Sequence, residues 1–455
     1  MIQLHESKGE MQQYVALSYC WGGKTQYELS ARTRSEMAKG IDASYLPQTI
    51  RDAIGLTREL GFKFIWIDAL CIRQDSREDW ERQSLDMGSI YRNASLTLIT
   101  SRAAAVTEGF LLPTKPHATH CGVATFKGQR KSVYLVADPE NPLHSLDPLS
   151  RRGWAFQERQ MSSCKVVFGS AEMTWECRQA SICESVASKR LKNPSTPLTS
   201  IPDWSSWVAA YSGSLLTRPS DRLPAISGVA RYFAELSGDE YIAGHWRWTL
   251  LQSLTWRIMS SCTPAERPHC YIAPSWSWAS VGHVKHEIEG PQRSLDVIGV
   301  LTDHSTTLAG SNPYGELLGS WIEVLAPVFD IDHRRFSPDS NFMVPVTTYT
   351  PDQLAQAASG VSGDEIHKAF MARKARGWSL NEAAELFWDW TGLTSASTRL
   401  SCVVLTRSHR YQDLYGIIVE PVPDRIDIFK RVGMFRNCVD VFTQSGWPAR
   451  KIRIL

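Results

Sequence analysis

Two carboxylates, two arginines and one thiol stand out as side chains that could perform chemistry. Asp68 follows a run of apolar residues, and Cys71 comes three residues later. Glu158 lies six residues after Arg152, which itself follows Arg151. Guanidinium groups bind carboxylates and phosphates through paired hydrogen bonds. The arginines could therefore hold the phosphate of a ligand, or one of them could form a structural ion pair with Glu158.

Each of these side chains also has a purely structural explanation. Asp68 could cap the turn that follows it, through the backbone N–H groups of that turn. A thiol nucleophile needs a neighbouring base and a lowered pKa, and no histidine is near Cys20 or Cys71 in the sequence. Cysteine is also among the most frequently buried residue types. Folding could still bring one of three histidines close to a thiol: His117, His120 and His144.

The elements that must position these residues are expected to be alternating strands and helices. Continuous apolar runs predict the strands, and apolar residues three and four apart predict the helices between them. In chain order the expected elements are strand 14–19, helix 46–60, strand 62–68, helix 77–91 and strand 95–100. The run 62–68 is almost wholly apolar, as buried parallel strands are. This alternation predicts a parallel sheet with right-handed crossovers and helices on its faces, and a further strand is expected at 132–137, after a loop rich in proline and histidine.

Polar residues and glycines collect where these strands end. They occupy Ser18–Lys24 after the first strand, Asp68–Gln74 after the second, and Ser101–Arg102 after the third. Open parallel sheets bind ligands beyond the carboxyl ends of their strands, so the sequence predicts a ligand site at that edge. Gly22 and Gly23 indicate a tight turn rather than a phosphate loop, since neither GxGxxG nor GxxxxGK[ST] is present.

The second half of the chain has a different character. A stretch rich in proline and serine near 185–205 is typical of a connection, so we expect a first domain at 1–185 and a second at 200–455. Within the second domain, 203–260 is helical in pattern, and beyond it short apolar runs alternate with turn residues, which predicts strands. The remaining expected elements are a helical insertion near 351–392, over Glu365–Trp390, and closing strands at 415–422 and 451–455.

Composition argues against several classes of protein. A chain of 455 residues with 43% hydrophobic residues can form substantial cores, and its net charge of +2 gives no reason to expect nucleic acid or an anionic membrane as a partner. No stretch approaches 18 consecutive apolar residues, so we expect no membrane span, and the polar N-terminus lacks a signal sequence. The 10 cysteines are scattered and form no CxxC pair. They indicate reduced thiols, and a cytoplasmic or nuclear protein is expected, with the cytoplasm preferred.

The unusual feature of the composition is the presence of 17 tryptophans. Tryptophan buries a large area, but its N–H needs a hydrogen-bond partner. These residues could build a Trp-rich core, or they could line an aromatic pocket for a flat ligand. A metal site is not expected, because the nearest approach to a ligand pattern, His117, His120 and Cys121, has no second pair at ligand spacing.

Three blocks of sequence resemble the fungal heterokaryon-incompatibility (HET) domain family, in the order and spacing of that family. They are Tyr14–Gly23 (YVALSYCWGG), Phe64–Gln74 (FIWIDALCIRQ) and Ser150–Glu158 (SRRGWAFQE). The second half resembles the region that often follows this domain, through Asp221–Gly228, Tyr241–Trp246, Ala273–Ala279 and Arg431–Phe435. The resemblance thus covers nearly the whole chain.

The resemblance implies an α/β fold similar to TIR domains, with a flavodoxin-like parallel sheet and flanking helices, followed by a Trp-rich α+β region. It implies a role in self/non-self recognition, in which the domain triggers cell death when unlike hyphae fuse. TIR relatives include enzymes that cleave the nicotinamide N-glycosidic bond of NAD, through a state resembling an oxocarbenium ion. A carboxylate facing the ribose can stabilise that charge or act as nucleophile, by analogy with glycosidases. By this analogy Glu158 and Asp68 are the candidate carboxylates.

These observations predict one site. The predicted catalytic residues are Glu158, Asp68, Cys71 and Arg152. The predicted ligand-binding residues are Ser18, Cys20, Trp21, Gly22, Gly23, Gln74, Trp154 and Gln157. Polar residues at strand ends in three separated blocks are hard to explain by packing alone. We therefore expect Trp21, Asp68, Gln74, Arg152 and Glu158 to converge on one concave surface.

Three functional hypotheses follow. The leading one is a HET-type effector whose N-terminal domain binds or cleaves a nucleotide-like ligand, with NAD as a candidate substrate, or self-associates. Its partner is a small molecule or another incompatibility protein, and the C-terminal half would regulate it. The second is a secondary-metabolite enzyme that acts on an aromatic or polyketide-like substrate in a Trp-lined pocket between the halves. The third is a non-catalytic interaction module. The sequence does not decide whether catalysis occurs.

Overall fold

The structure, a computed structural model, consists of two compact units that are described separately. The first comprises Met1–Ile201, Ser214–Thr217 and Pro224–Glu235, and the second comprises Pro202–Gly213, Arg218–Leu223 and Leu236–Leu455. The chain therefore passes between the units several times, where the sequence predicted a single boundary. The structure describes residues 1–23, 27–111, 118–126, 129–136, 147–177, 179–184, 190–191, 204–259, 268, 270–282, 286–288, 295–331, 343–345, 383–389, 400–408, 413–437 and 449–455.

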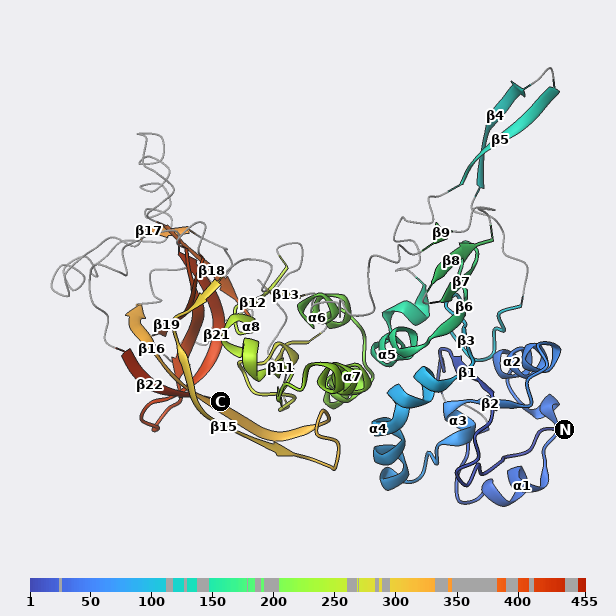
Figure 1. Ribbon diagram of the computed structural model, residues 1–455, viewed down its shortest axis with the longest axis horizontal. Helices are drawn as coiled ribbons and strands as arrows, with labels where there is room; N and C mark the ends of the chain where they lie inside the picture. The colour runs from blue at the N-terminus through green and yellow to red at the C-terminus, as the bar shows by residue number, and fades with distance from the viewer. Residues whose placement is uncertain are drawn as a thin grey trace. The chain divides into compact units, whose positions relative to one another are not determined.

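The first unit is a mixed α/β structure built on a seven-stranded sheet with the order β2-β1-β3-β6-β7-β8-β9. Its strands are β1 (Tyr14–Ser18), β2 (Phe64–Trp66), β3 (Leu96–Ile99), β6 (Cys164–Phe168), β7 (Met173–Cys177), β8 (Ala180–Cys183) and β9 (Arg190–Leu191). The first four strands in this order pair in parallel, and the others pair antiparallel. The parallel pairing of β1 with both β2 and β3 confirms the predicted core of the sheet (Figure 1).

Helices α2 (Gln48–Glu59) and α4 (Arg77–Asn93) connect these strands, close to the predicted ranges. The other helical segments of the unit are α1 (Arg34–Lys39), η1 (Ala43–Tyr45), α3 (Asp68–Cys71), η3 (Pro148–Arg151), α5 (Gly153–Met161), η5 (Pro224–Ile226) and most of α7 (Ser227–Ser237). Ile50 and Ile54 of α2 are buried against Val15 and Leu17 of β1. Because side chains alternate along a strand, this contact fixes which face of β1 each later residue takes.

Two expected strands of the first unit differ in the structure. β2 is shorter than the predicted run 62–68 and half-buried instead of buried, because it is the terminal strand of the sheet and pairs with β1 alone among the described strands. The strand expected at 132–137 does not join the parallel sheet. It is β5 (Gln129–Val136), which pairs antiparallel with β4 (Ala118–Phe126), where a loop was expected. The threonines and valine of 118–126 favour a strand, and β6 is the fourth parallel strand.

The second unit is built mainly on a nine-stranded sheet. Its strands are β14 (Leu295–Val297), β15 (Val300–Leu308), β16 (Leu317–Ile331), β17 (Met343–Pro345), β18 (Ala383–Trp388), β19 (Leu400–Ser408), β20 (Leu414–Pro421), β21 (Ile428–Asn437) and β22 (Ala449–Ile454). The remaining elements are α6 (Trp204–Ser212), η4 (Pro219–Arg222), β10 (Tyr241–Ile242), β11 (His245–Trp246), η6 (Arg247–Thr249), α8 (Leu250–Ser253), β12 (Trp256–Ile258), η7 (Trp278–Ser280) and β13 (His286–Ile288). The expected strands near 415–422 and 451–455 correspond to β20 and β22.

The helix expected over Glu365–Trp390 is wrong for the part that the structure describes. Residues 383–388 form β18, which pairs antiparallel with β21 and places Phe387 opposite Met434. Alanine, glutamate and leucine favour a helix locally, but cross-strand pairing overrides that propensity. Residues 365–382 and 390 lie outside the described residues.

Tryptophans of the second unit form part of its core. The side chains of Trp256, Trp276 and Trp278 are fully buried. Trp256 Nε1 donates a hydrogen bond of 2.8 Å to the carbonyl of Trp276. Trp204 Nε1 and Trp278 Nε1 both donate to the carbonyl of Gly244, at 2.8 and 2.7 Å. Three of these four indoles therefore have both burial and a partner for the N–H, as a core tryptophan requires.

The packing of β20 gives a first testable prediction. A Cβ added to Gly416 would collide with the carbonyl oxygen of Val403 and would lie 2.7 Å from the ring of Phe435. Gly416→Ala is therefore expected to lower the free energy of unfolding by about 2 kcal/mol, as overpacked cores do. Gly319→Ala is the matched control, because a Cβ at this strand glycine meets no atom within 4 Å. Chemical denaturation of both variants measures the effect, and equal stabilities would contradict the prediction.

Candidate functional site

Glu158 lies beneath the carboxyl end of β1, on helix α5. Its side chain is only 7% exposed, and its Oε2 accepts a hydrogen bond from the hydroxyl of Ser18, the last residue of β1. Arg152 immediately precedes α5, and its guanidinium donates to the carbonyl of Tyr19. No ion pair joins Glu158 to Arg152 among the described residues. The structure therefore does not contain the alternative, a structural ion pair between Arg152 and Glu158.

The surroundings of Glu158 keep its carboxyl group partly protonated at neutral pH. Burial raises the pKa of Glu158 from 4.5 to about 7, against the opposing effects of the Ser18 hydrogen bond and the charge of Arg152. The charge of Asp68 raises this pKa further, and a hydrogen bond from Tyr91 lowers it. A carboxyl group with a pKa near 7 can both accept and release a proton at physiological pH, as a general acid or base must.

Asp68 is the first residue of α3 and is half-buried. Its Oδ2 accepts a hydrogen bond of 2.8 Å from Trp21 Nε1, and its Oδ1 accepts one of 2.7 Å from the backbone N–H of Ala69. The second bond is the capping contact that the sequence left open as a structural explanation. Burial raises the pKa of Asp68, while the bond from Trp21 and the charge of Arg152 lower it. The carboxylate thus caps a turn and also belongs to the same electrostatic cluster as Glu158.

The two carboxyl groups are bonded by residues at and just beyond the end of β1. Ser18, the last residue of the strand, donates to Glu158, while Trp21, three residues later, donates to Asp68. Arg152 reaches across the end of the strand, and its charge lowers the pKa of both Asp68 and Glu158. The arrangement therefore consists of two carboxyl groups that share one cation at the carboxyl end of β1.

Two tyrosines of this cluster were missed by the sequence reasoning. Tyr19 is buried, and burial and the charge of Asp68 raise its pKa well above the usual value. The hydroxyl of Tyr91 on α4 donates to the carbonyl of Leu17 at 2.9 Å. An alternation argument could have found Tyr19, since it packs in the same hydrophobic cluster as Leu17, two residues earlier. Tyr91 could not be found this way, because its contact depends on how α4 crosses the sheet.

Neither predicted thiol is activated. Cys20 is buried, and burial raises its pKa against the opposing charge of Arg152. Burial raises the pKa of Cys71 to about 11, and its Sγ accepts the N–H of Ile67 at 3.5 Å. A thiol with a raised pKa is a poor nucleophile at neutral pH. Of the three histidines, His117 and His144 lie outside the described residues, and His120 lies in β4, whose side chains are not described.

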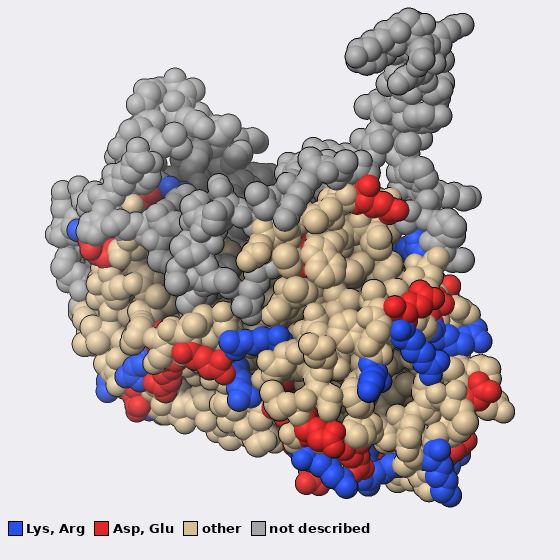
Figure 2. Space-filling model, turned by 45° about the vertical axis from the view of Figure 1, so that its right-hand side comes forward, with Lys and Arg blue, Asp and Glu red and all other residues tan. Residues whose placement is uncertain are grey.

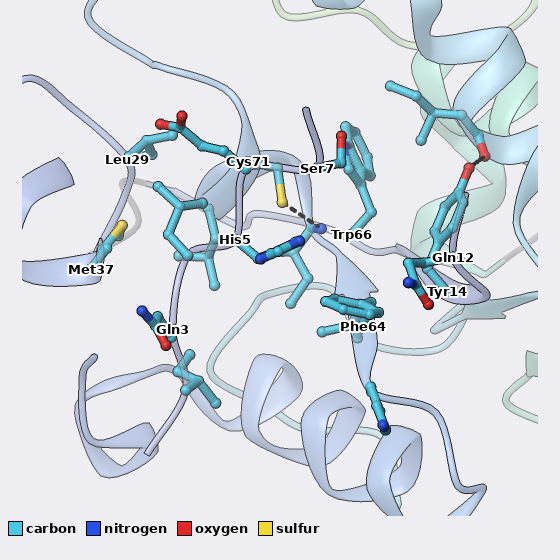
Figure 3. Close-up of a pocket in the computed structure, with 18 of the residues that line it drawn as sticks. Gln3, His5, Ser7, Gln12, Tyr14, Leu29, Met37, Phe64, Trp66 and Cys71 are labelled. Atoms are coloured by element: carbon cyan, nitrogen blue, oxygen red, sulfur yellow. Dashed lines mark hydrogen bonds between the residues drawn. The ribbon is translucent and has the colours of Figure 1, made fainter. Parts of the chain in front are cut away.

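A groove of about 1230 Å³ lies on the other side of α3, beside the terminal strand β2 (Figure 3). Cys71, His5 and Trp66 line it, and the rings of His5 and Phe64 lie 5.0 Å apart. None of the cluster around Glu158 lines this groove. The groove and the charged cluster are therefore separate features.

The other predicted ligand residues have structural contacts. Gln74 Nε2 donates to the carbonyls of Asp68 and Ile72 at 3.2 and 3.0 Å, which supports the α3 turn. Trp154 packs edge-on against Trp80 with ring centroids 6.0 Å apart. Of the residues expected to converge, Trp21, Asp68, Arg152 and Glu158 lie in one cluster, and Gln74 contacts it through the backbone of Asp68.

Three further predicted ligand residues are explained by backbone geometry and packing. Gly22 and Gly23 both have positive φ, at 69° and 137°, which fits the predicted tight turn. A Cβ on Gly22 would collide with Ala105, so this glycine allows the close approach of a neighbouring loop. Gln157 turns away from the cluster, and its Oε1 accepts the N–H of Gly228 at 2.9 Å.

The face shown in Figure 2 has no large area of one charge among the described residues. On the face in Figure 2, basic and acidic side chains of the described residues are interspersed, in keeping with the small net charge. Among the described residues, no helix is long and apolar enough to cross a bilayer. In the same residues, no cluster of three or more His, Cys, Asp or Glu side chains could hold a metal ion.

Comparisons with known proteins give one match. Residues 14–158 match the family model described as heterokaryon incompatibility protein (HET). The matched segment begins at β1 and ends at Glu158, so it contains Asp68 and Arg152 as well. Comparisons with curated proteins and with solved structures gave no match.

Proposed function

We propose that the first unit, whose residues 14–158 match the heterokaryon incompatibility family model, is an effector that binds and cleaves a nucleotide such as NAD. The observation that carries the proposal is the buried carboxyl group of Glu158 at the carboxyl end of β1. Its pKa is about 7, and the charges of Asp68 and Arg152 act on it. Perturbed carboxyl groups of this kind cluster at functional sites. The resulting loss of NAD would be the signal for cell death after unlike hyphae fuse.

The strand order supports a TIR-like, flavodoxin-like arrangement for the parallel part of the sheet. In the order β2-β1-β3-β6 the chain runs outward from β1 to β2 and then crosses to β3 on the other side of β1. The crossover makes β1 and β3 the topological switch point, beyond which doubly wound sheets bind ligands. Ser18, Arg152 and Glu158 all lie at this point.

The chemistry assigned to the cluster is hydrolysis of an N-glycosidic bond. Cleavage breaks the bond between the ribose carbon and the nicotinamide nitrogen, and the electron pair leaves with nicotinamide and neutralises its ring. Asp68 is partly buried, and its negative charge would stabilise the oxocarbenium-like ribose. A water molecule then bonds to the ribose carbon, and ionised Glu158 would accept its proton. Arg152 would hold a phosphate of the ligand.

Release of nicotinamide from NAD tests this proposal. The purified full-length protein is expected to release it, and Glu158→Gln is expected to reduce the rate by at least about 100-fold, as loss of a general base does. Asp68→Asn is expected to have a similar effect. Glu172→Gln is the matched control, because Glu172 is also 7% exposed and lies outside the cluster. An unmodified protein that binds and cleaves no NAD would overturn the proposal, as would a Glu158→Gln variant that keeps full activity.

A further inference from the structure

Helix α5 is held at its start by residues that lie far along the chain. The N–H of Gly153 donates to the carbonyl of Leu215 at 2.8 Å, and the N–H of Leu215 donates to the carbonyl of Arg151 at 2.6 Å. These two bonds form a parallel bridge between Arg152 and Leu215. A Cβ on Gly153 would lie 2.5 Å from the side chain of Leu216, so this glycine makes room for the returning segment. The backbone around Arg152 is thus fixed by residues 214–217.

A second contact holds the middle of α5. The N–H of Gly228, at the start of α7, donates to Gln157 Oε1 at 2.9 Å. A Cβ on Gly228 would lie 2.7 Å from Cα of Gly88 and 2.8 Å from Gln157 Oε1. The backbones of α4 and α7 therefore touch through two glycines, and α5 is bonded at this crossing. Glu158 is the next residue after Gln157, so the same crossing determines where its carboxyl group lies.

The segment that makes these contacts is anchored in the second unit. Residues 214–217 and 224–235 belong to the first unit, but 202–213 and 218–223 belong to the second. Within the second unit, Arg222 is 2% exposed and donates to the carbonyls of Ser212 and Gly282. The hydroxyl of Tyr211 donates to the carbonyl of Arg222 at 2.7 Å. Arg222 therefore closes the base of the loop that carries Leu215.

These contacts explain the block Asp221–Gly228, which the sequence singled out and the proposed function does not use. Its Arg222 belongs to the second unit and its Gly228 to the first. We propose that residues 214–228 are a positioning segment, which holds Arg152 and Glu158 in place only while the second unit keeps its fold. The C-terminal half would then regulate the site through the chain itself. The inference takes the role of Glu158 from the proposed function, but its test does not depend on NAD cleavage.

The stretch 214–217 is short, only four residues, and residues of the second unit flank it on both sides. If the second unit loosens, both flanks of this stretch lose their fixed positions, and the bridge to Arg152 loses its support. Water then reaches Glu158. None of the groups that shift the pKa of Glu158 lies within 214–228; they are Ser18, Arg152, Asp68 and Tyr91. A change in the pKa of Glu158 in a variant of this segment would therefore show that water has reached the carboxyl group, because no neighbouring charge has been removed.

Gly228→Ala in the full-length protein tests the contact directly. Hydrogen exchange of the α5 amides, residues 153–161, is expected to accelerate by about tenfold or more, as local opening becomes easier. The pH dependence of stability that Glu158 contributes is expected to shrink, because a hydrated carboxyl group returns toward its ordinary pKa. A merely structural loss would lower stability equally at all pH values. Gly55→Ala is the matched control, since a Cβ at this helical glycine of α2 meets no atom within 4 Å.

Arg222→Met tests the dependence on the second unit. It removes a buried cation that joins Ser212 and Gly282 without touching any residue of the first unit's cluster. Exchange of α5 is expected to rise with that of α6, while exchange of α2 stays unchanged. Unchanged exchange in α5 and an unchanged pH dependence in both variants would overturn the inference. A protein that cleaves no NAD but shows these exchange changes would retain the inference and lose the proposed function.

Discussion

Replacement of Asp389 by alanine is expected to lower the free energy of unfolding of the second unit by about 3–5 kcal/mol, because it leaves a buried cation without its counter-ion. Asp389 accepts hydrogen bonds from Nε and Nη2 of Arg431 at 2.8 and 3.1 Å. The side chains are 2% and 0% exposed. Arg431 also donates to the carbonyls of Leu254 and Trp256 and lies over the Trp256 ring at 3.5 Å. Urea denaturation measures the loss.

The pair itself is expected to contribute little net stability. Burial is the largest influence on both groups, and it raises the pKa of Asp389 and lowers the pKa of Arg431 despite their mutual attraction. Desolvation therefore outweighs the Coulombic gain. The double variant Asp389→Leu/Arg431→Met should recover most of the stability that the single variant loses, since an apolar pair of similar volume carries no desolvation cost. A double variant as unstable as Asp389→Ala would show that the pair stabilises the fold directly.

The fold of the first unit was predictable where local pattern and tertiary environment agree. Strands 14–19 and 95–100 are short apolar runs that become the buried strands β1 and β3. The run 62–68 is equally apolar, yet β2 is half-buried, because its position at the end of the sheet depends on strand order and not on its own composition. In the second unit, β18 has the composition of a helix but forms a strand, because β17 and β21 pair with it.

The sequence predicted the residues of the candidate site better than it predicted their contacts. Polar residues at the ends of strands led to Ser18 and Asp68, because the carboxyl ends of parallel strands meet at one edge. The contact of Glu158 with Ser18 spans 140 residues and that of Gly153 with Leu215 joins segments outside any continuous motif. Neither follows from periodicity or spacing. The motif blocks predicted which residues belong to the site. The helix crossings that bring these residues together depend on three-dimensional packing, which the motifs do not encode.

Glu158→Gln is expected to remove most of a pH dependence of about 3 kcal/mol in the stability of the first unit. Burial raises the pKa of Glu158 from 4.5 to about 7, so the folded protein retains a proton that the unfolded chain releases. Stability contributed by this group is therefore fully present below pH 4.5 and is lost as the pH rises to about 7. Glutamine is neutral at every pH and keeps the shape that accepts the hydrogen bond of Ser18.

The expected comparison is therefore between two pH values. At about pH 5 the variant and the unmodified protein should have similar stabilities, and at about pH 8 the variant should be more stable by about 3 kcal/mol, by urea denaturation. Glu172→Gln, at an equally buried glutamate outside the cluster, is the matched control. A loss of about 3–5 kcal/mol in Glu158→Gln at neutral pH would instead identify Glu158 as the counter-ion of a buried Arg152. The geometry favours the first outcome, because Arg152 donates to the carbonyl of Tyr19 and keeps that partner when the charge of Glu158 is removed. If removal of the Glu158 carboxyl group raises the free energy of unfolding, that group destabilises the native protein. This is the pattern expected of a residue that is retained for function.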